Sequence, residues 1–224
     1  QMSRRVIRQL VLVAVVLGTA VGLPLLVRAA MLAALSSRAQ PSTVVQTLCF
    51  LPEADTYVDA RRPEKNFGLS TRLEADGKPA QISYVRFRVT GIDGMILSAT
   101  LRLWVLNPSK SIGGTIVQVN DSGWSETELT FSSRPAVDER PVATLRAAEQ
   151  DTWVEANVTQ AVTGDGPVSL AITSMVEDGA GYASRERSDG PQLLVTVQTN
   201  QTVPGQSTTA GEVSGEADPC AMVR

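Results

Sequence analysis

Regular alternation of apolar and polar residues is the feature that most constrains how this chain can fold. Between residues 49 and 197 apolar side chains recur at every second position, in short runs separated by Gly, Pro, Asn and Asp. The clearest run places four apolar residues on one side: Ala99, Leu101, Leu103 and Val105. Because successive side chains of a strand point to opposite faces, this period predicts antiparallel strands with one buried face each.

The predicted strands cover most of the middle of the chain. They lie at 55–60, 70–76, 83–90, 96–106, 114–120, 152–159, 167–175 and 192–199. Roughly eight to ten strands over ~150 residues favour an antiparallel jelly-roll β-sandwich, since a parallel sheet would need long crossover helices. The only helical pattern in this region is short, at 157–164.

The N-terminal part has the pattern of an export segment. A basic stretch at 1–9 precedes an apolar stretch at 10–35, of which Leu10 to Val27 carries no charge. Arginines before an apolar run predict that the N-terminus stays in the cytoplasm and that the rest crosses the membrane. The run exceeds a typical signal-peptide core and approaches the ~20 residues that span a bilayer. We expect a retained transmembrane helix; the alternative is a signal peptide cleaved after Ala39.

The rest of the chain divides by composition. We expect a linker at 36–47, a β-domain at 48–198 and a flexible polar tail at 199–224, which is rich in Ser, Thr, Gly and Gln. The two cysteines are Cys49 and Cys220. Outside the cytoplasm they could form a disulfide that ties the tail to the domain, although the intervening tail could equally leave them unpaired.

Composition excludes several kinds of function. The net charge is −3, which gives little reason to expect nucleic-acid binding. The chain has no histidine, so it lacks the commonest general base and the commonest transition-metal ligand. Carboxylate chemistry and oxygen-ligated calcium remain open. We expect a protein that is not an enzyme.

Seven motifs in order give the middle region a family resemblance. They are FLPEADTYVDA (50–60), NFGLSTRLEAD (66–76), SYVRFRV (83–89), SATLRLWV (98–105), WSETELTFSSRPA (124–136), WVEANVTQAV (153–162) and YASRERSDGPQLLVTV (182–197). Together they resemble the DNRLRE family of extracellular bacterial and archaeal jelly-roll domains. Relatives of that family include carbohydrate-binding modules attached to polysaccharide lyases, so the resemblance implies carbohydrate binding. Asn157 and Arg88 depart from the family pattern, which usually has acidic residues there.

The segment 122–136 holds the densest set of chemically interesting side chains. We expect Trp124 to close one end of the core, with its indole N–H bonded to a loop carbonyl; the alternative is a platform for a sugar ring. In an extended segment Glu126 and Glu128 would share a side about 7 Å apart. Paired carboxylates can hydrolyse glycosides, but the neighbouring Ser and Thr residues indicate a solvated loop, and we expect no catalysis there.

A basic loop at 59–68 is the first candidate for ligand contact. Arg61, Arg62 and Lys65 form a local cluster of positive charge beside Tyr57 and Phe67. Guanidinium groups match the carboxylates of uronic acids, and aromatic rings match sugar faces. We therefore predict ligand-binding roles for Tyr57, Arg61, Arg62 and Lys65; the alternative is a solvated charged loop.

A calcium site is the second candidate. If the first and last strands lie side by side, the loop at 184–190 would bring Glu186 and Asp189 close to Asp55 and Asp59. Four carboxylates at one place would suit calcium, which prefers six to eight oxygen ligands. The alternative is an ion pair between Arg185 and Glu186 that clamps the loop.

Two classes of function follow from the sequence. The first is an exported, membrane-anchored module that binds polysaccharide at the cell surface. The second is a single-pass structural subunit whose external domain contacts neighbouring proteins of the envelope or of a membrane complex.

Overall fold

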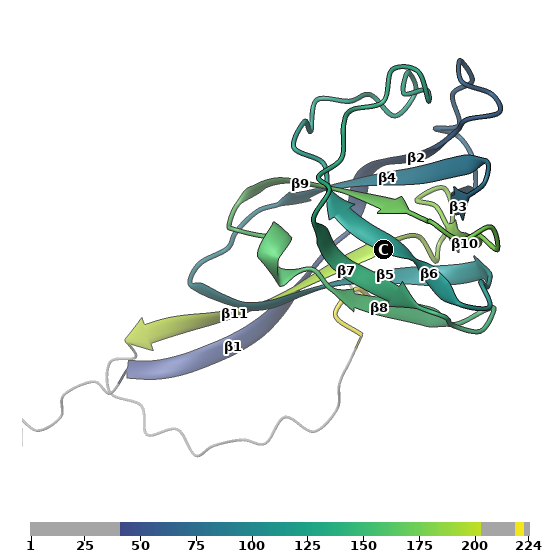
Figure 1. Ribbon diagram of the computed structural model, residues 1–224. Coiled ribbons are helices and arrows are strands. Elements are labelled where there is room, and N and C mark those ends of the chain that lie inside the picture. Colours follow the sequence, from purple (N-terminus) through teal and green to yellow (C-terminus); the bar gives the residue numbers. More distant parts are fainter. Residues whose placement is uncertain (1–40, 203–217, 222–224) are drawn as a thin grey trace, which may run out of the picture. The chain divides into compact units, whose positions relative to one another are not determined.

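The computed structural model describes residues 41–202 and 218–221, and all of the secondary structure except one short turn is β. Residues 43–200 and 218–221 belong to one compact unit (Figure 1). The strands are β1 (Pro41–Phe50), β2 (Pro52–Asp59), β3 (Arg72–Gly77), β4 (Ala80–Val89), β5 (Met95–Asn107), β6 (Ile112–Gln118), β7 (Pro141–Arg146), β8 (Trp153–Asn157), β9 (Gly166–Thr173), β10 (Ala180–Ala183) and β11 (Gln192–Thr202). A 3₁₀ turn, η1 (Thr159–Ala161), lies where the sequence predicted a short helical segment.

The strands form one continuous curled sheet. Its path runs β1-β11-β5-β10-β3-β4-β9-β6-β7, with β2 added beside β4 and β8 added beside β5. The registers among β2 to β11 are antiparallel. Because β7 lies against β8, the far end of the path returns to the strands near its start (Figure 1). The prediction of an all-β antiparallel fold is confirmed, but β10 joins the two expected sheets into one.

The curl encloses a core of the alternating apolar residues. From β5 the four predicted side chains Ala99, Leu101, Leu103 and Val105 are all buried. They meet side chains of the opposite half of the sheet, Val85, Phe87, Ile116, Leu145, Leu170 and Ile172. The alternation therefore specifies the inner face strand by strand, and burying that face is what curls the sheet.

Three strands were missing from the sequence prediction. Strands β7 and β10 are short and lie in segments interrupted by polar residues and glycine. Strand β1 begins at Pro41, inside the predicted linker, and lies beside β11. The predicted transmembrane segment at 10–35 and most of the predicted tail lie outside the described residues. Within the part of the chain that the structure describes, no helix is long and apolar enough to cross a membrane.

A second, smaller core lies on the other face of β4. Tyr84 is fully buried although its neighbours Val85 and Phe87 face the main core. The loop between β6 and β7, residues 119–140, covers Tyr84, and we call it the Trp124 loop. Trp124 is 6% exposed, contacts Tyr84 edge to face at 6.1 Å between ring centroids, and donates its indole N–H to the Ser169 hydroxyl at 2.9 Å. Trp124 is thus a core residue as predicted. The predictions that it closes an end of the main core and bonds a carbonyl were wrong.

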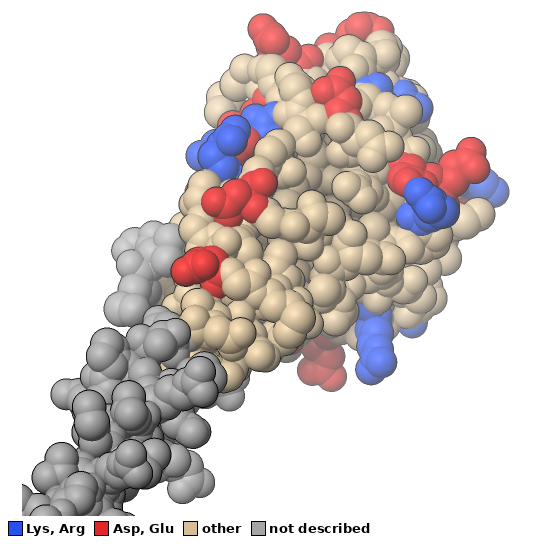
Figure 2. Space-filling model, turned by 90° about the vertical axis from the view of Figure 1, so that its left-hand side faces the viewer, with Lys and Arg blue, Asp and Glu red and all other residues tan. Residues whose placement is uncertain are grey.

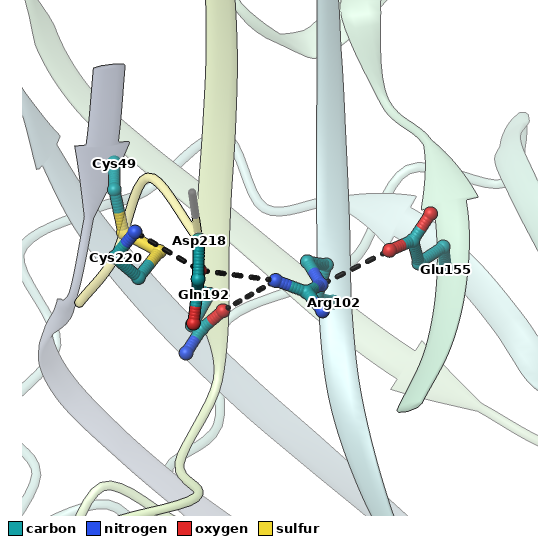
Figure 3. The surroundings of a disulfide bond; sticks show 6 residues. All are labelled: Cys49, Arg102, Glu155, Gln192, Asp218 and Cys220. Atoms are coloured by element: carbon teal, nitrogen blue, oxygen red, sulfur yellow. Dashed lines mark hydrogen bonds and ion pairs between the residues drawn. A yellow bond between two sulfur atoms is a disulfide. The ribbon is translucent and has the colours of Figure 1, made fainter. Parts of the chain in front are cut away.

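A disulfide joins Cys49 at the end of β1 to Cys220, with 5.3 Å between the Cα atoms (Figure 3). Beside it, Asp218 accepts the Cys220 N–H at 3.0 Å and lies 3.6 Å from the Arg102 guanidinium. A bridge over a sequence separation of 171 residues restricts the unfolded chain. Such bridges typically stabilise a fold by about 2–4 kcal/mol.

We expect Trp124→Ala to lower the free energy of unfolding by ~3–5 kcal/mol, because it removes a buried aromatic ring and leaves the Ser169 hydroxyl without its donor. Denaturant titration measures this loss. Trp153→Ala, at a half-buried tryptophan on the outer face of β8, should cost less. Equal losses for the two variants would contradict the second core.

Candidate functional site

The acidic cluster of Asp55, Glu126 and Glu186 is the most unusual group of side chains in the described residues. Each residue offers one carboxylate oxygen, and these atoms lie within 4.8 Å of one another, so the cluster could hold a metal ion. Asp55 comes from β2, Glu126 from the Trp124 loop and Glu186 from the loop between β10 and β11. Segments distant in the sequence therefore converge at one edge of the sheet.

Asp55 is the buried member of this cluster, with only 1% of its surface exposed. Its backbone N–H donates to Glu126 Oε1 at 2.7 Å, and its Oδ2 accepts the Arg185 N–H at 2.8 Å. Its Oδ1 has no hydrogen-bond partner. Burial raises the pKa of Asp55 to about 8; the Arg185 N–H opposes this shift, and the charges of Glu186 and Glu126 add to it.

Arg185 supplies the positive charge beside the cluster. Its guanidinium donates from Nη1 to Glu126 Oε2 at 2.9 Å, and the Glu126 side chain is only 15% exposed. Glu186 instead accepts the Ser184 hydroxyl at 2.7 Å. Arg185 therefore clamps the Trp124 loop to its own loop through Glu126, and not through the ion pair with Glu186 that was the alternative to a calcium site.

Two of the four predicted calcium ligands lie elsewhere. Asp59 accepts the Arg61 N–H at 2.9 Å and the Arg62 guanidinium at 3.0 Å. Burial alone would raise the pKa of Asp59, but these hydrogen bonds hold it below its ordinary value. Asp189 accepts two hydrogen bonds from the Arg187 guanidinium, both at 2.8 Å. Each of these carboxylates is thus engaged by an arginine close to it in the sequence.

The approach of Glu186 to Asp55 was predicted correctly, but for the wrong reason. The segment 55–60, which was predicted as the first strand, belongs to β2. Strand β2 pairs with β4, whereas the last strand, β11, lies between β1 and β5. Glu186 instead comes near Asp55 because β10 pairs with β3 and brings residue 184, at the start of the β10–β11 loop, beside residues 70 and 71. There Ser184 donates to the Ser70 carbonyl at 2.6 Å.

The position of Glu126 relative to Glu128 differs from the prediction. An extended segment would place Glu126 and Glu128 on one side, but the chain turns at 126–128, and the Leu129 N–H donates to the Ser125 carbonyl at 2.9 Å. The turn separates the two glutamates. Glu128 is exposed, whereas Glu126 points back toward Asp55.

The basic loop, residues 59–68, packs directly against the Trp124 loop. Asn66 donates its side-chain amide to the carbonyls of Glu126 and Leu129, both at 2.8 Å. The Ser132 N–H donates to the Pro63 carbonyl at 3.0 Å. A Cβ atom at Gly68 would lie 2.1 Å from the Glu126 carbonyl oxygen, so only glycine allows this approach. The loop that carries the cations is therefore held by the same segment that supplies Glu126.

The side chains of the basic loop divide into exposed and supporting groups. Arg61 and Arg62 have side chains 62% and 50% exposed, and Lys65 is exposed as well. Tyr57 and Phe67 stack at 4.3 Å between ring centroids and are each 9% exposed. The guanidinium of Arg62 and the ammonium of Lys65 lie 4.8 Å and 5.0 Å from the centre of the Phe67 ring. The rings support the cations from below, and Tyr57 offers no free face to a sugar.

A groove of about 520 Å³ lies on the outer face of β5, β8 and β11. Its lining includes Arg102, Glu155 and Asp218. Arg102 forms an ion pair with Glu155 at 3.0 Å and donates to Gln192 at 3.2 Å (Figure 3). Its guanidinium also lies 4.8 Å from the centre of the Trp153 ring. These contacts already engage the guanidinium, so this groove is a weaker candidate for an anionic ligand than the basic loop.

The fold and these surfaces define a β-sheet binding module whose polar loops are fixed by hydrogen bonds. The family model of carbohydrate-binding module family 96 matches residues 46–197, and the chain belongs to that family. It is therefore a non-catalytic carbohydrate-binding module, in agreement with the predictions of carbohydrate binding and of no enzymatic activity. A search of curated proteins finds no match. The narrower likeness to DNRLRE domains and to modules of lyases remains a prediction.

We expect Gly68→Ala to lower the free energy of unfolding by about 1–3 kcal/mol, because its methyl group would overlap the Glu126 carbonyl and push the two loops apart. Thermal or denaturant unfolding measures the effect. Gly123→Ala is the matched control, since its added Cβ meets only the Asp121 side-chain oxygen at 3.1 Å. A Gly68→Ala variant as stable as this control would disprove the close packing.

Proposed function

We propose that this module binds an acidic polysaccharide outside the cytoplasm, and that the exposed cations of the basic loop make the contact. The observation that carries the proposal is the local arrangement of Arg61, Arg62 and Lys65 in a protein of net charge −3. Guanidinium groups bind carboxylates through paired hydrogen bonds, which suits the uronic acids of an acidic glycan.

The support beneath these cations favours binding over a merely solvated loop. Arg62 is oriented by Asp59, and Lys65 by the face of Phe67. Asn66 fixes the loop itself to the Trp124 loop. A loop fixed in this way loses less conformational entropy when a ligand binds. Elsewhere, acidic and basic side chains are scattered over a mostly uncharged surface on the face in Figure 2, so the attraction would be local.

Export is the second part of the proposed function. The arginine-flanked apolar stretch at 10–35 supports a membrane-anchored module displayed outside the cell, with secretion after cleavage as the alternative. The disulfide between Cys49 and Cys220 supports an oxidising compartment.

We expect affinity for a polyuronate to fall as salt rises from roughly 50 to 500 mM, because exposed charge contacts are screened over ~8 Å at physiological ionic strength. Calorimetric titration of the protein with a polyuronate measures this. Arg61→Ala/Lys65→Ala should weaken binding about tenfold or more while keeping the Arg62–Asp59 pair intact. Adding Arg62→Ala should abolish binding.

The matched control is Lys110→Ala/Arg140→Ala, which removes the same charge from exposed positions on other loops. This control should bind almost normally. Salt-independent binding of a neutral glycan would contradict the proposal. If Trp153→Ala abolished that binding, the site would be the groove beside Arg102. If no polysaccharide in a broad panel binds, the alternative of a structural domain that contacts other proteins is favoured.

We expect protease added to intact cells to remove the β-domain while cytoplasmic marker proteins survive, because the segment at 10–35 directs the following residues across the membrane. Immunoblotting against the domain measures its loss. Permeabilised cells are the control, in which the markers are degraded as well. A domain that is cut only after permeabilisation would contradict display at the surface.

A further inference from the structure

We propose that Asp55, Glu126 and Glu186 form a calcium site that fastens the β10–β11 loop and the Trp124 loop to β2. The three carboxylates come from three separate segments, and each places an oxygen within 4.8 Å of the others. A single ion at this position would contact all three segments at once. This inference does not depend on the identity of the glycan or on glycan binding.

The unpartnered oxygen of Asp55 points to a ligand more strongly than the gathering of acidic residues does. Asp55 is 1% exposed, and its Oδ1 has no hydrogen-bond partner. Leaving a polar atom buried without a partner is costly, and most such atoms in proteins are satisfied. A cation bound to Oδ1 would supply the missing partner and would stabilise the ionised form of this carboxylate.

The charge balance of the cluster also favours a cation. Three carboxylates meet, and the guanidinium of Arg185 is the one positive group that pairs with them among the described residues, through Glu126 Oε2 at 2.9 Å. The Arg185 N–H contact to Asp55 Oδ2 leaves Oδ1 available. A divalent cation would compensate for the negative charge that Arg185 leaves unpaired in the cluster.

The chemistry of the ligands selects calcium among metals. All three side chains offer carboxylate oxygens, the chain has no histidine, and both cysteines are in the disulfide. Metals that prefer nitrogen or sulfur ligands therefore lack them here. Calcium accepts mono- or bidentate carboxylates from flexible segments and completes six to eight ligands with water, whereas magnesium demands a stricter octahedral geometry.

An ion at this position would hold neighbouring loops in place as well as compensate local charge. Glu126 lies in the segment whose carbonyls receive the Asn66 amide, so the ion would also steady the basic loop. Ser184, next to Arg185, is bonded both to Glu186 and to the Ser70 carbonyl. The site would thus tie together the loops at one edge of the sheet.

The test is calorimetric titration of calcium chloride into the full-length protein after removal of metal with a chelator, followed by melting with and without calcium. We expect one ion per chain and a rise in melting temperature of about 5 °C or more at saturating calcium. Magnesium should bind about tenfold more weakly or worse. If ~10 mM calcium gives no binding heat and no shift in melting temperature, the site is overturned. Magnesium binding as tight as calcium binding would overturn the choice of ion.

Substitutions separate a metal site from a purely structural cluster. Asp55→Asn replaces a buried carboxylate by a neutral group of the same shape, so it should melt at the same or a higher temperature without metal and lose the calcium-dependent shift. Glu186→Gln, at an exposed position, should also lose the shift, and it serves as the test if Asp55→Asn does not fold. Asp189→Asn is the matched control from the same loop and should keep the shift, since Arg187 holds that carboxylate. Unchanged calcium binding in Glu186→Gln would refute the proposal.

Discussion

Burial of the alternating apolar face is the interaction on which the rest of this structure depends. The strands carry most of their apolar residues on one side, and the sheet removes them from water by curling until its two halves face each other. Strand β10 makes the curl continuous because it pairs with β3 on one side and β5 on the other. The same strand carries the chain to the loop of Arg185 and Glu186, so closing the core also positions the polar edge.

Glu126 links the polar edge to the second core. Its neighbour Trp124 is anchored by Tyr84 and by the Ser169 hydroxyl, which fixes the start of the turn. The guanidinium of Arg86 lies 4.8 Å from the centre of the Trp124 ring and donates to the Trp124 carbonyl at 2.6 Å. The Glu126 side chain contacts Asp55 and Arg185. The segment with the densest set of polar side chains in the sequence is therefore mainly structural, and it places one carboxylate beside Asp55.

The sequence predicted the fold well because period-two alternation is a local signal that reports directly on the inner face. It predicted the site less well because the site depends on turns and on pairing between distant segments. Glu126 was misplaced by assuming an extended chain, whereas the Ser125 carbonyl accepts two N–H groups and starts a turn. Asp59 and Asp189 were wrongly predicted as calcium ligands although a local signal existed. Each lies within three residues of an arginine that forms an ion pair with its carboxylate. The burial of Asp55 had no such signal, since it follows from loops that close over β2.

The two candidate surfaces carry opposite charges, and several arginines pair with carboxylates close to them in the sequence. Asp59 is the instructive case: its buried carboxylate holds Arg62 at one end of β2, while Asp55, four residues earlier on the same strand, is left without an ion partner at Oδ1. Alternation places Asp55, Tyr57 and Asp59 on the same side of the strand. One strand thus carries a carboxylate that orients an arginine and another whose Oδ1 has no hydrogen-bond partner. Tyr57, between these two aspartates in the sequence, stacks on Phe67, and the Phe67 ring contacts the cations of Arg62 and Lys65, so the same strand also helps to hold the basic loop.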